Sequence, residues 1–427
     1  MPGSDYSKQL EKRQKIKRTT LVVGLDIGYE FNAMGLMNKE GEVIGRYEKV
    51  YNSRRGFAYF VQAIELAKRK HGLKEVLIGM EPTGHYWRKI AYFAQGCGYE
   101  VRFVRTTALK HQRELDESSS AKCDIKDAVT IANIVREGKY IDTVIEDGVY
   151  RQLRTLAKMR ERLQRYYVGS QHALRAVIDD YFPELTEIFW AMKAKGLWAV
   201  LERSPFPQDV LGLGLEELTE IIARGSKRKF EAGKKARVVY QAAGTSIGLT
   251  HPGVADYYRL KIYLSEVKRM AGQIKELELE MKKLLKQAPL AKYLISIRGI
   301  GVISAAVFLG ELGSPEHFKG FKQIVKYAGY DPQEHDSGLR TGRKIISKKG
   351  RWLLRKILYF MSLGAIRQNK YFRDYYDRKL AGRNRFGREL TKKEALCAVV
   401  IKLIKVIFAL FRDRRMFSIK TPALALV

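Results

Sequence analysis

Four carboxylates stand where they could hold metal ions. Asp26 ends an apolar run in GLDIG, and Glu81 ends another in GMEPTGHYW. Asp124 and Asp127 in KCDIKDA are three residues apart, which places both on one face of a helix. Mg²⁺ prefers such oxygen ligands, and two ions can stabilise the attacking and leaving oxygens of a phosphodiester. We therefore predict a Mg²⁺ site here, with Mn²⁺ as an alternative ion. The ordinary alternative is that Asp124 caps a helix and Glu81 pairs with a Lys or Arg.

A serine beside a dense basic run is the second chemical feature. Ser337 lies in EHDSGLRTGRKIISKKGRWLLRK, residues 334–356. A serine hydroxyl becomes a good nucleophile when a base or a metal ion activates it. We prefer metal activation over the local bases His335 and Asp336. The basic side chains predicted to neutralise phosphate charge are Arg340, Arg343, Lys344, Lys348, Lys349, Arg351 and Arg355. The alternative is that this run is only a solvated surface.

A Gly-Ile-Gly turn lies between two apolar helical segments in LISIRGIGVISAAVFLGELG, residues 294–313. This is the pattern of a helix-hairpin-helix motif. The amides of Gly299 and Gly301, at a helix N-terminus, are predicted to hold a DNA phosphate without reading sequence. The alternative is a tight turn between two packed helices.

The composition favours a globular protein with a polyanionic partner. The chain has 427 residues, of which 46% are hydrophobic, enough for two or three domains with cores. Lys and Arg number 79 against 46 Asp and Glu, a net charge of +33 that favours nucleic acid. Three scattered cysteines argue against a disulfide framework or a zinc site and fit a reducing cytoplasm. The apolar segment 395–411 is short for a membrane span and carries two lysines.

The first third of the chain alternates between strand and helix patterns. Strands are predicted at 20–28, 31–38, 42–50, 74–81 and 99–106, and helices at 56–72, 85–98 and 121–137. Their order is that of the ribonuclease H-like fold, in which the first and fourth strands are neighbours and the third helix packs against them. All four carboxylates would then converge. GLDIG also resembles the phosphate loop of sugar kinases, but those loops usually continue with Thr or Ser, whereas Tyr29 follows here.

The rest of the chain is mainly helical. Apolar residues recur every three or four positions from Leu153 to Tyr181 and from Leu260 to Leu285. These stripes suit either a coiled-coil pair or dimer seam, or bundle packing within one chain. Residues 182–259 between them are mixed in pattern and include a basic patch. Residues 1–19 are polar and basic, and we expect a flexible arm rather than a signal peptide.

These motifs together resemble insertion-sequence family 110 with its 1111 branch, the DEDD transposases, also called bridge-RNA-guided recombinases. The N-terminal match is VGLDIG, GMEPTGHYW and KCDIKDAVTIA. The C-terminal match is GIGVISAAVFLGELG, FKQIVKYAGYDPQEHDSG and ISKKGRWLLRKILY. The match covers most of the chain and is loose over about 182–259. Cys123 stands where members more often have Thr.

The resemblance implies an α/β plus α architecture. It implies a RuvC-like metal domain at 20–145, a helical coiled-coil dimerisation region at 146–290 with an insertion at about 182–259, and a C-terminal transposase domain at 291–427. The acidic tetrad would be Asp26, Glu81, Asp124 and Asp127. Ser337 would attack DNA to give a phosphoserine-linked strand, followed by strand exchange and religation.

The partners that the resemblance implies are donor and target DNA, a structured bridge RNA, and further copies of the chain in a dimer that assembles to a tetramer. No membrane is involved, and the expected location is the prokaryotic cytoplasm at the nucleoid. Two other functions stand as alternatives. A junction-resolving nuclease would use the acidic site and water, so that Ser337→Ala would still cleave. A non-catalytic nucleic-acid-binding protein would depend on neither the acids nor the serine.

Overall fold

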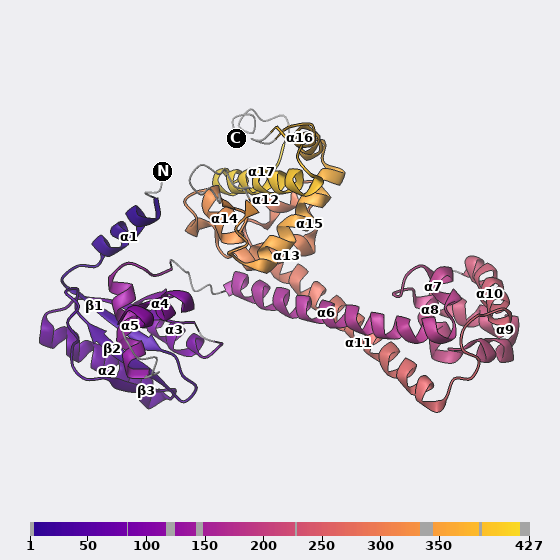
Figure 1. Ribbon diagram of the computed structural model, residues 1–427, viewed down its shortest axis with the longest axis horizontal. Coiled ribbons are helices and arrows are strands. Elements are labelled where there is room, and N and C mark those ends of the chain that lie inside the picture. Colours follow the sequence, from indigo (N-terminus) through magenta and orange to yellow (C-terminus); the bar gives the residue numbers. More distant parts are fainter. Residues whose placement is uncertain are drawn as a thin grey trace. The chain divides into compact units, whose positions relative to one another are not determined.

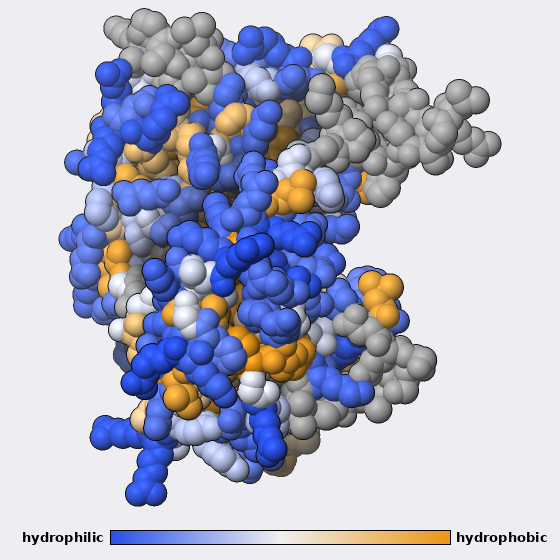
Figure 2. Space-filling model, turned by 90° about the vertical axis from the view of Figure 1, so that its left-hand side faces the viewer, coloured by the Kyte–Doolittle hydropathy of each residue, from blue (hydrophilic) through white to orange (hydrophobic). Residues whose placement is uncertain are grey.

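The computed structural model describes residues 4–82, 84–116, 124–141, 148–226, 229–333, 345–383 and 387–418. The chain forms two compact units, Met1–Ile145 and Glu146–Val427 (Figure 1). Hydrophilic side chains dominate the face seen in Figure 2, as expected for a net charge of +33. Within the described ranges, no helix combines the length and apolar character required to cross a bilayer.

A five-stranded sheet forms the centre of the first unit, with the order β3-β2-β1-β4-β5. Its strands are β1 (Thr20–Asp26), β2 (Phe31–Met37), β3 (Glu48–Tyr51), β4 (Glu75–Met80) and β5 (Glu100–Phe103). β1 pairs antiparallel with β2 and parallel with β4, so β1 and β4 end at the same edge. The predicted mixed α/β unit, with the first and fourth strands as neighbours, is confirmed. The predicted strand 42–50 is shorter, because Gly45 takes a positive φ of 74° ahead of β3.

Helices cover both faces of this sheet. α2 (Arg54–His71) and α3 (Trp87–Gly96) share one apolar core with it. α4 (Thr106–Asp116) and α5 (Asp124–Arg136) share a second core on the other face. α2 ends at Gly72 in the left-handed conformation, as its terminal glycine predicts. α4 was not predicted, whereas α5 is the third helix of the predicted order and contacts β1 and β4.

Helix α1 (Ser4–Lys15) replaces the expected flexible arm, and that expectation is wrong for these residues. Ile16, directly after α1, is buried in the core beside α5. Lys12 Nζ donates to the Tyr140 carbonyl at 2.8 Å and lies 4.7 Å from the centre of the Tyr140 ring. These contacts fasten the basic N-terminal segment to the chain that follows α5.

Two long helices, α6 (Gly148–Tyr181) and α11 (Val254–Gln287), run antiparallel and pack against each other in the second unit (Figure 1). Arg160 and Glu278, polar interruptions of the two apolar stripes, pair with each other, with Arg160 Nε 2.8 Å from Glu278 Oε1. Stripe residues such as Leu174 and Leu264 are buried within the chain. Packing within one chain therefore uses these stripes, and a dimer seam stays a prediction.

Separate cores form at the two ends of this helical hairpin. One core is a cap at 184–244, made of α7 (Glu184–Phe189), α8 (Lys195–Arg203), α9 (Pro207–Ser226) and α10 (Lys229–Gly244). The other core includes α12 (Ala291–Ile295), α13 (Val302–Leu312), α14 (Phe321–Ala328), α15 (Trp352–Gln368), α16 (Lys370–Leu380) and α17 (Lys392–Asp413). Leu153 of α6 and Met281 of α11 belong to this second core, so packing is continuous across residue 290.

Candidate active site

Asp26 and Glu81 are neighbours at one edge of the sheet. Asp26 is the last residue of β1, and Glu81 directly follows β4. The parallel register pairs Leu25 with Met80, so Asp26 and Glu81 are the next residues along adjacent strands. Adjacent strands lie about 4.8 Å apart, which is close enough for two carboxylates to share a ligand. Both residues are partly exposed at this edge.

A row of glycines across the sheet lets α5 approach it closely. Gly24 of β1 is in register with Gly35 of β2 and with Gly79 of β4. A Cβ at Gly24 would lie 1.9 Å from the Ala128 carbonyl oxygen of α5, and one at Gly79 would lie 2.3 Å from Val135 Cγ2. Any side chain in this glycine row would therefore push α5 away. Sequence reasoning missed the row, although Gly24 and Gly79 each stand two residues before a candidate acid.

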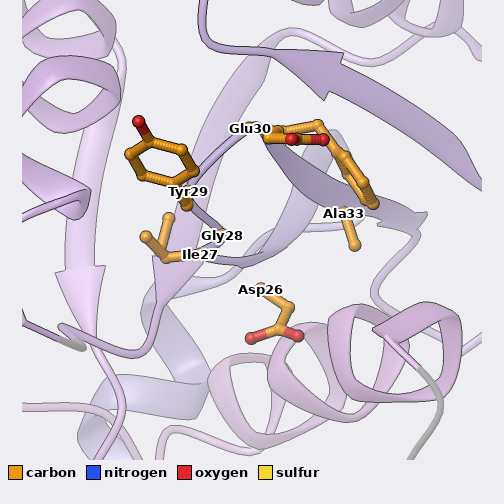
Figure 3. A pocket seen from close by; sticks show the side chains of 7 residues that line it. Asp26, Ile27, Gly28, Tyr29, Glu30 and Ala33 are labelled. Carbon is orange, nitrogen blue, oxygen red and sulfur yellow. The ribbon is translucent and has the colours of Figure 1, made fainter.

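Asp26 faces the same side of the sheet as this row. Side chains alternate along a strand, so Asp26 follows Gly24 on the face that α5 covers. Figure 3 shows Asp26 pointing away from Tyr29 and Glu30. A pocket of about 260 Å³ opens beside it, lined by Asp26, Ile27, Gly28, Tyr29, Glu30, Phe31 and Ala33. The carboxylate thus lies where the strand end, the following turn and α5 meet.

Asp124 and Asp127 belong to the first turn of α5. Asp127 is buried and directly precedes Ala128, which packs on Gly24. Its Oδ1 accepts a hydrogen bond from Arg113 Nε of α4 at 2.5 Å. The Asp124 side chain lies outside the described part of the structure. Arg113 is a site residue that sequence reasoning missed, because no local pattern links it to an acid in the next helix.

The donor set fits a hard divalent cation in its chemistry and its backbone placement. Two carboxylates end neighbouring strands, and the helix carrying the other two starts close to the same sheet face. Among the described side chains, no three His, Cys, Asp or Glu residues are gathered around one point. One of the four acids, Asp127, instead forms a salt bridge with the Arg113 side chain.

Two short antiparallel strands, together called the serine hairpin, flank the span 334–344 that includes the predicted serine. β6 (Pro332–Gln333) pairs with β7 (Ile345–Ile346), with Pro332 opposite Ile346. Ser347 Oγ donates to the Asp331 carboxylate, and Ser347 N donates to the Asp331 carbonyl at 2.9 Å, which extends the pairing beyond β7. The predicted site residues that lie in the span 334–344, outside the described residues, are His335, Asp336, Ser337, Arg340, Arg343 and Lys344.

Two arginines of the basic run have their contacts inside the chain. Arg351 Nη1 donates to the Glu311 carbonyl at 2.8 Å, and its guanidinium lies 4.7 Å from the centre of the Tyr327 ring. Arg355 Nη1 donates to the carbonyls of Ala328 and Lys348, both at 3.1 Å. These two arginines therefore clamp the turn between β7 and α15, whereas Lys348 and Lys349 are exposed.

Buried polar groups support this clamp from beneath. Glu311 is only 2% exposed, and Arg154 Nε and Arg351 Nη1 each lie 3.8 Å from its carboxylate. Burial raises the pKa of Tyr330 above its usual range, so its hydroxyl stays protonated and donates to the Arg355 carbonyl at 3.1 Å. Tyr330 thus holds the main chain of Arg355, and Arg351 lies beside the buried carboxylate of Glu311 in α13.

The Gly-Ile-Gly segment connects α12 to α13. A Cβ at Gly299, which has a φ of 102°, would lie 2.3 Å from the Gly364 carbonyl oxygen of α15. Gly299 is therefore required for packing inside the chain, and the predicted contact of its amide with a DNA phosphate stays a prediction. Gly301 is exposed at the N-cap of α13, with open space around its Cα. Its predicted contact with DNA stays a prediction.

Comparison with known proteins gives matches at both ends of the chain. Residues 23–183 match the transposase family DEDD_Tnp_IS110, and residues 291–377 match the family described as Transposase IS116/IS110/IS902. The 44.8 kDa protein of insertion element IS116 from Streptomyces clavuligerus is 24% identical over 402 residues, 94% of this chain and 96% of that protein.

Two further relatives agree with these matches. The 43.6 kDa protein of insertion element IS110 from Streptomyces coelicolor is 24% identical over 77% of this chain and 80% of that protein. The transposase for insertion sequence element IS1111A of Coxiella burnetii is 27% identical over 40% of this chain and 44% of that protein.

Proposed function

The chain belongs to the IS110 family of insertion-sequence transposases, and we propose that it recombines DNA with a serine nucleophile and an acidic metal site. The observation that carries this proposal is the sheet edge where Asp26 and Glu81 end adjacent parallel strands. The glycine row beneath α5 supports the same edge, because it brings the first turn of α5 towards it.

In this proposal Asp26, Glu81, Asp124 and Asp127 would hold Mg²⁺ or Mn²⁺. When bound, the ion would supply Lewis-acid stabilisation of the charge that develops on a phosphate. The glycine row lets the first turns of α5, and with them the main chain of Asp127, pack against β1. Arg113 balances the charge of the buried Asp127 carboxylate. This chain therefore orients its acids through the backbone, and loss of either support would disorganise the site.

Ser337 is proposed as the attacking group. Its Oγ forms an ester bond with a DNA phosphorus, and the bond from that phosphorus to one deoxyribose oxygen breaks. The leaving oxygen takes up a proton, and the serine hydroxyl releases its own to solvent; activation by the acidic site is preferred over His335 and Asp336 as local bases. After strand exchange, a deoxyribose hydroxyl attacks the phosphoserine, which restores the serine and reseals the strand.

A structured bridge RNA is proposed to pair with donor and target DNA. The protein is proposed to act at the nucleoid as dimers that assemble into tetramers. In that assembly, the acidic site of one copy would meet Ser337 of another. Mixing Asp26→Ala with Ser337→Ala chains tests this arrangement. Recombination should return in the mixture, because some assemblies combine an intact acidic site with an intact serine. A mixture as inactive as each variant alone would contradict the arrangement.

Cleavage and recombination assays separate this proposal from its two alternatives. The full chain, Asp26→Ala and Ser337→Ala are compared on labelled DNA with the element's RNA, with and without Mg²⁺. Our proposal predicts that both substitutions abolish recombination. A nuclease that uses water predicts that Ser337→Ala still cleaves. A non-catalytic binding protein predicts that neither substitution changes the outcome.

A further inference from the structure

Lys348 has a backbone conformation that lysine seldom adopts. It lies in the turn between β7 and α15, with a φ of 53°. The left-handed region brings Cβ too close to the following carbonyl, so only glycine adopts it without strain, and Asn or Asp at reduced strain. Strained residues of this kind persist where surrounding contacts enforce them, and they cluster at functional sites. Trp190 and Arg414 share this conformation, so Lys348 is singled out by its strain together with its place, two residues after β7.

Several contacts enforce this conformation. Lys348 N donates to the Gly329 carbonyl at 3.1 Å, and Arg355 Nη1 donates to the Lys348 carbonyl at the same distance. A Cβ at Gly329 would lie 3.1 Å from the Lys348 carbonyl carbon, and one at Gly350 would lie 2.5 Å from the Tyr327 carbonyl oxygen. Two glycines and an arginine clamp thus fix the turn from both sides, independently of the lysine side chain.

The lysine side chain itself supports none of these contacts. Lys348 and Lys349 are exposed, and neither forms an ion pair with another described residue. Their neighbours Arg351 and Arg355, by contrast, are engaged within the chain. The clamp therefore presents two ammonium groups to solvent, those of Lys348 and Lys349, two and three residues after the end of β7. An exposed ammonium group on a rigid turn is suited to a phosphate.

We propose that Lys348 contacts a backbone phosphate of the DNA strand brought to the serine hairpin, and that this contact accounts for the strained lysine. The proposal rests on the proposed function in one respect, that DNA is the polyanion that binds at the serine hairpin. Arg351 and Arg355 act as positioning residues, since they hold the turn and leave Lys348 to meet the phosphate. A contact with the bridge RNA instead of DNA is an outcome that the test distinguishes.

The test is a strain-relieving substitution that removes the charge. The Lys348→Gly variant should have the same melting temperature as the unsubstituted protein or one about 1–3 °C higher. It should bind a labelled DNA duplex about 3- to 10-fold more weakly, and the slope of log affinity against log salt should fall by about one. Lys348→Arg keeps the charge and should restore both affinity and slope.

Arg414→Gly is the matched control. Arg414 has a φ of 50° and is exposed after α17, where its only difference in pairing among the described residues is an exposed 3.9 Å contact with Glu316; Arg414→Gly loses the same charge and the same strain. It should raise the melting temperature similarly and leave the salt slope unchanged. The proposal is overturned if Lys348→Gly keeps the original affinity and slope, if Arg414→Gly loses as much, or if Lys348→Gly melts lower. It is also overturned if only binding of the element's RNA weakens.

This result and that of the serine chemistry are independent. If Ser337 forms no covalent bond with DNA while Lys348→Gly loses one unit of salt slope, the proposed chemistry fails and the phosphate contact stands. If the covalent bond forms while the slope is unchanged, the chemistry stands and the contact fails.

Discussion

The two candidate sites, the acidic sheet edge and the serine hairpin, are held in place by different kinds of contact. At the sheet edge, main-chain register places Asp26 beside Glu81, and a glycine row lets α5 pack close to the sheet. At the serine hairpin, side chains do this work, because Arg351 and Arg355 fasten the turn after β7 to carbonyls of α13 and α14. The acidic site should therefore depend on small residues, and the serine site on large charged ones.

The difference also separates two kinds of charge. At the sheet edge, buried Asp127 has its partner in Arg113, so an acid expected for catalysis is also structural. In the basic run, Arg351 and Arg355 are structural, whereas Lys348 and Lys349 stay exposed. Substitution of a structural charge such as Arg351 should therefore lower stability, whereas substitution of exposed Lys348 should weaken binding of nucleic acid.

The largest effect should follow from Asp26→Asn. The change removes a proposed ion ligand at nearly constant shape, so DNA strand cleavage should fall about a thousandfold, about 4 kcal/mol in activation free energy. Melting temperature should stay unchanged. Glu30→Gln is the matched control, since Glu30 is exposed and lines the same pocket. Full cleavage by Asp26→Asn would contradict the acidic site.

Gly24→Ala should destabilise the first unit by about 3 kcal/mol, because the new Cβ overlaps the Ala128 carbonyl and displaces α5. Chemical denaturation measures this change. Gly96→Ala, in α3 with open space around it, should change stability by less than about 1 kcal/mol. Equal stability of the two variants would remove the glycine row from the account.

Arg113→Ala should destabilise the protein by about 3 kcal/mol, since it leaves the buried Asp127 carboxylate without its cation. Added Mg²⁺ should raise the melting temperature of this variant more than that of the unaltered chain. Arg18→Ala, which breaks an exposed pair with Glu40, should change stability by less than about 1 kcal/mol. If Mg²⁺ stabilises both chains equally, Asp127 lies apart from the ion site.

Arg351→Met should reduce stability by about 2 kcal/mol through loss of its contacts with Glu311 and Tyr327. The salt dependence of DNA binding should be unchanged, because this guanidinium faces inward. Lys349→Met, two residues earlier and exposed, should change stability by less than about 0.5 kcal/mol. A reversed order of stabilities would show that the clamp assignment is wrong.

The sheet edge was predictable because it depends on local patterns. Alternating apolar residues predicted the strands, and their order placed Asp26 and Glu81 together. The Asp127–Arg113 pair was not predictable, because α4 buries few apolar residues and gives a weak helical pattern. The docking of α1 was missed for a similar reason, since Ile16 is a lone buried anchor in a polar segment.

The basic run shows where sequence reasoning stops. A series of Lys and Arg residues carries the same charge whether each side chain faces solvent or a carbonyl. The inward turn of Arg351 depends on Glu311, which is 40 residues away in the chain and buried in α13. Such a partner becomes visible only when the helices are packed.

The central claim is that Ser337 becomes covalently joined to DNA, and the most direct measurement is the mass of the protein after reaction with a suicide DNA substrate. We predict a protein–DNA adduct at Ser337 that requires Mg²⁺, Asp26 and the element's RNA, and that is absent from Ser337→Ala. Efficient strand cleavage without any adduct at Ser337 would contradict the account and favour a nuclease that uses water.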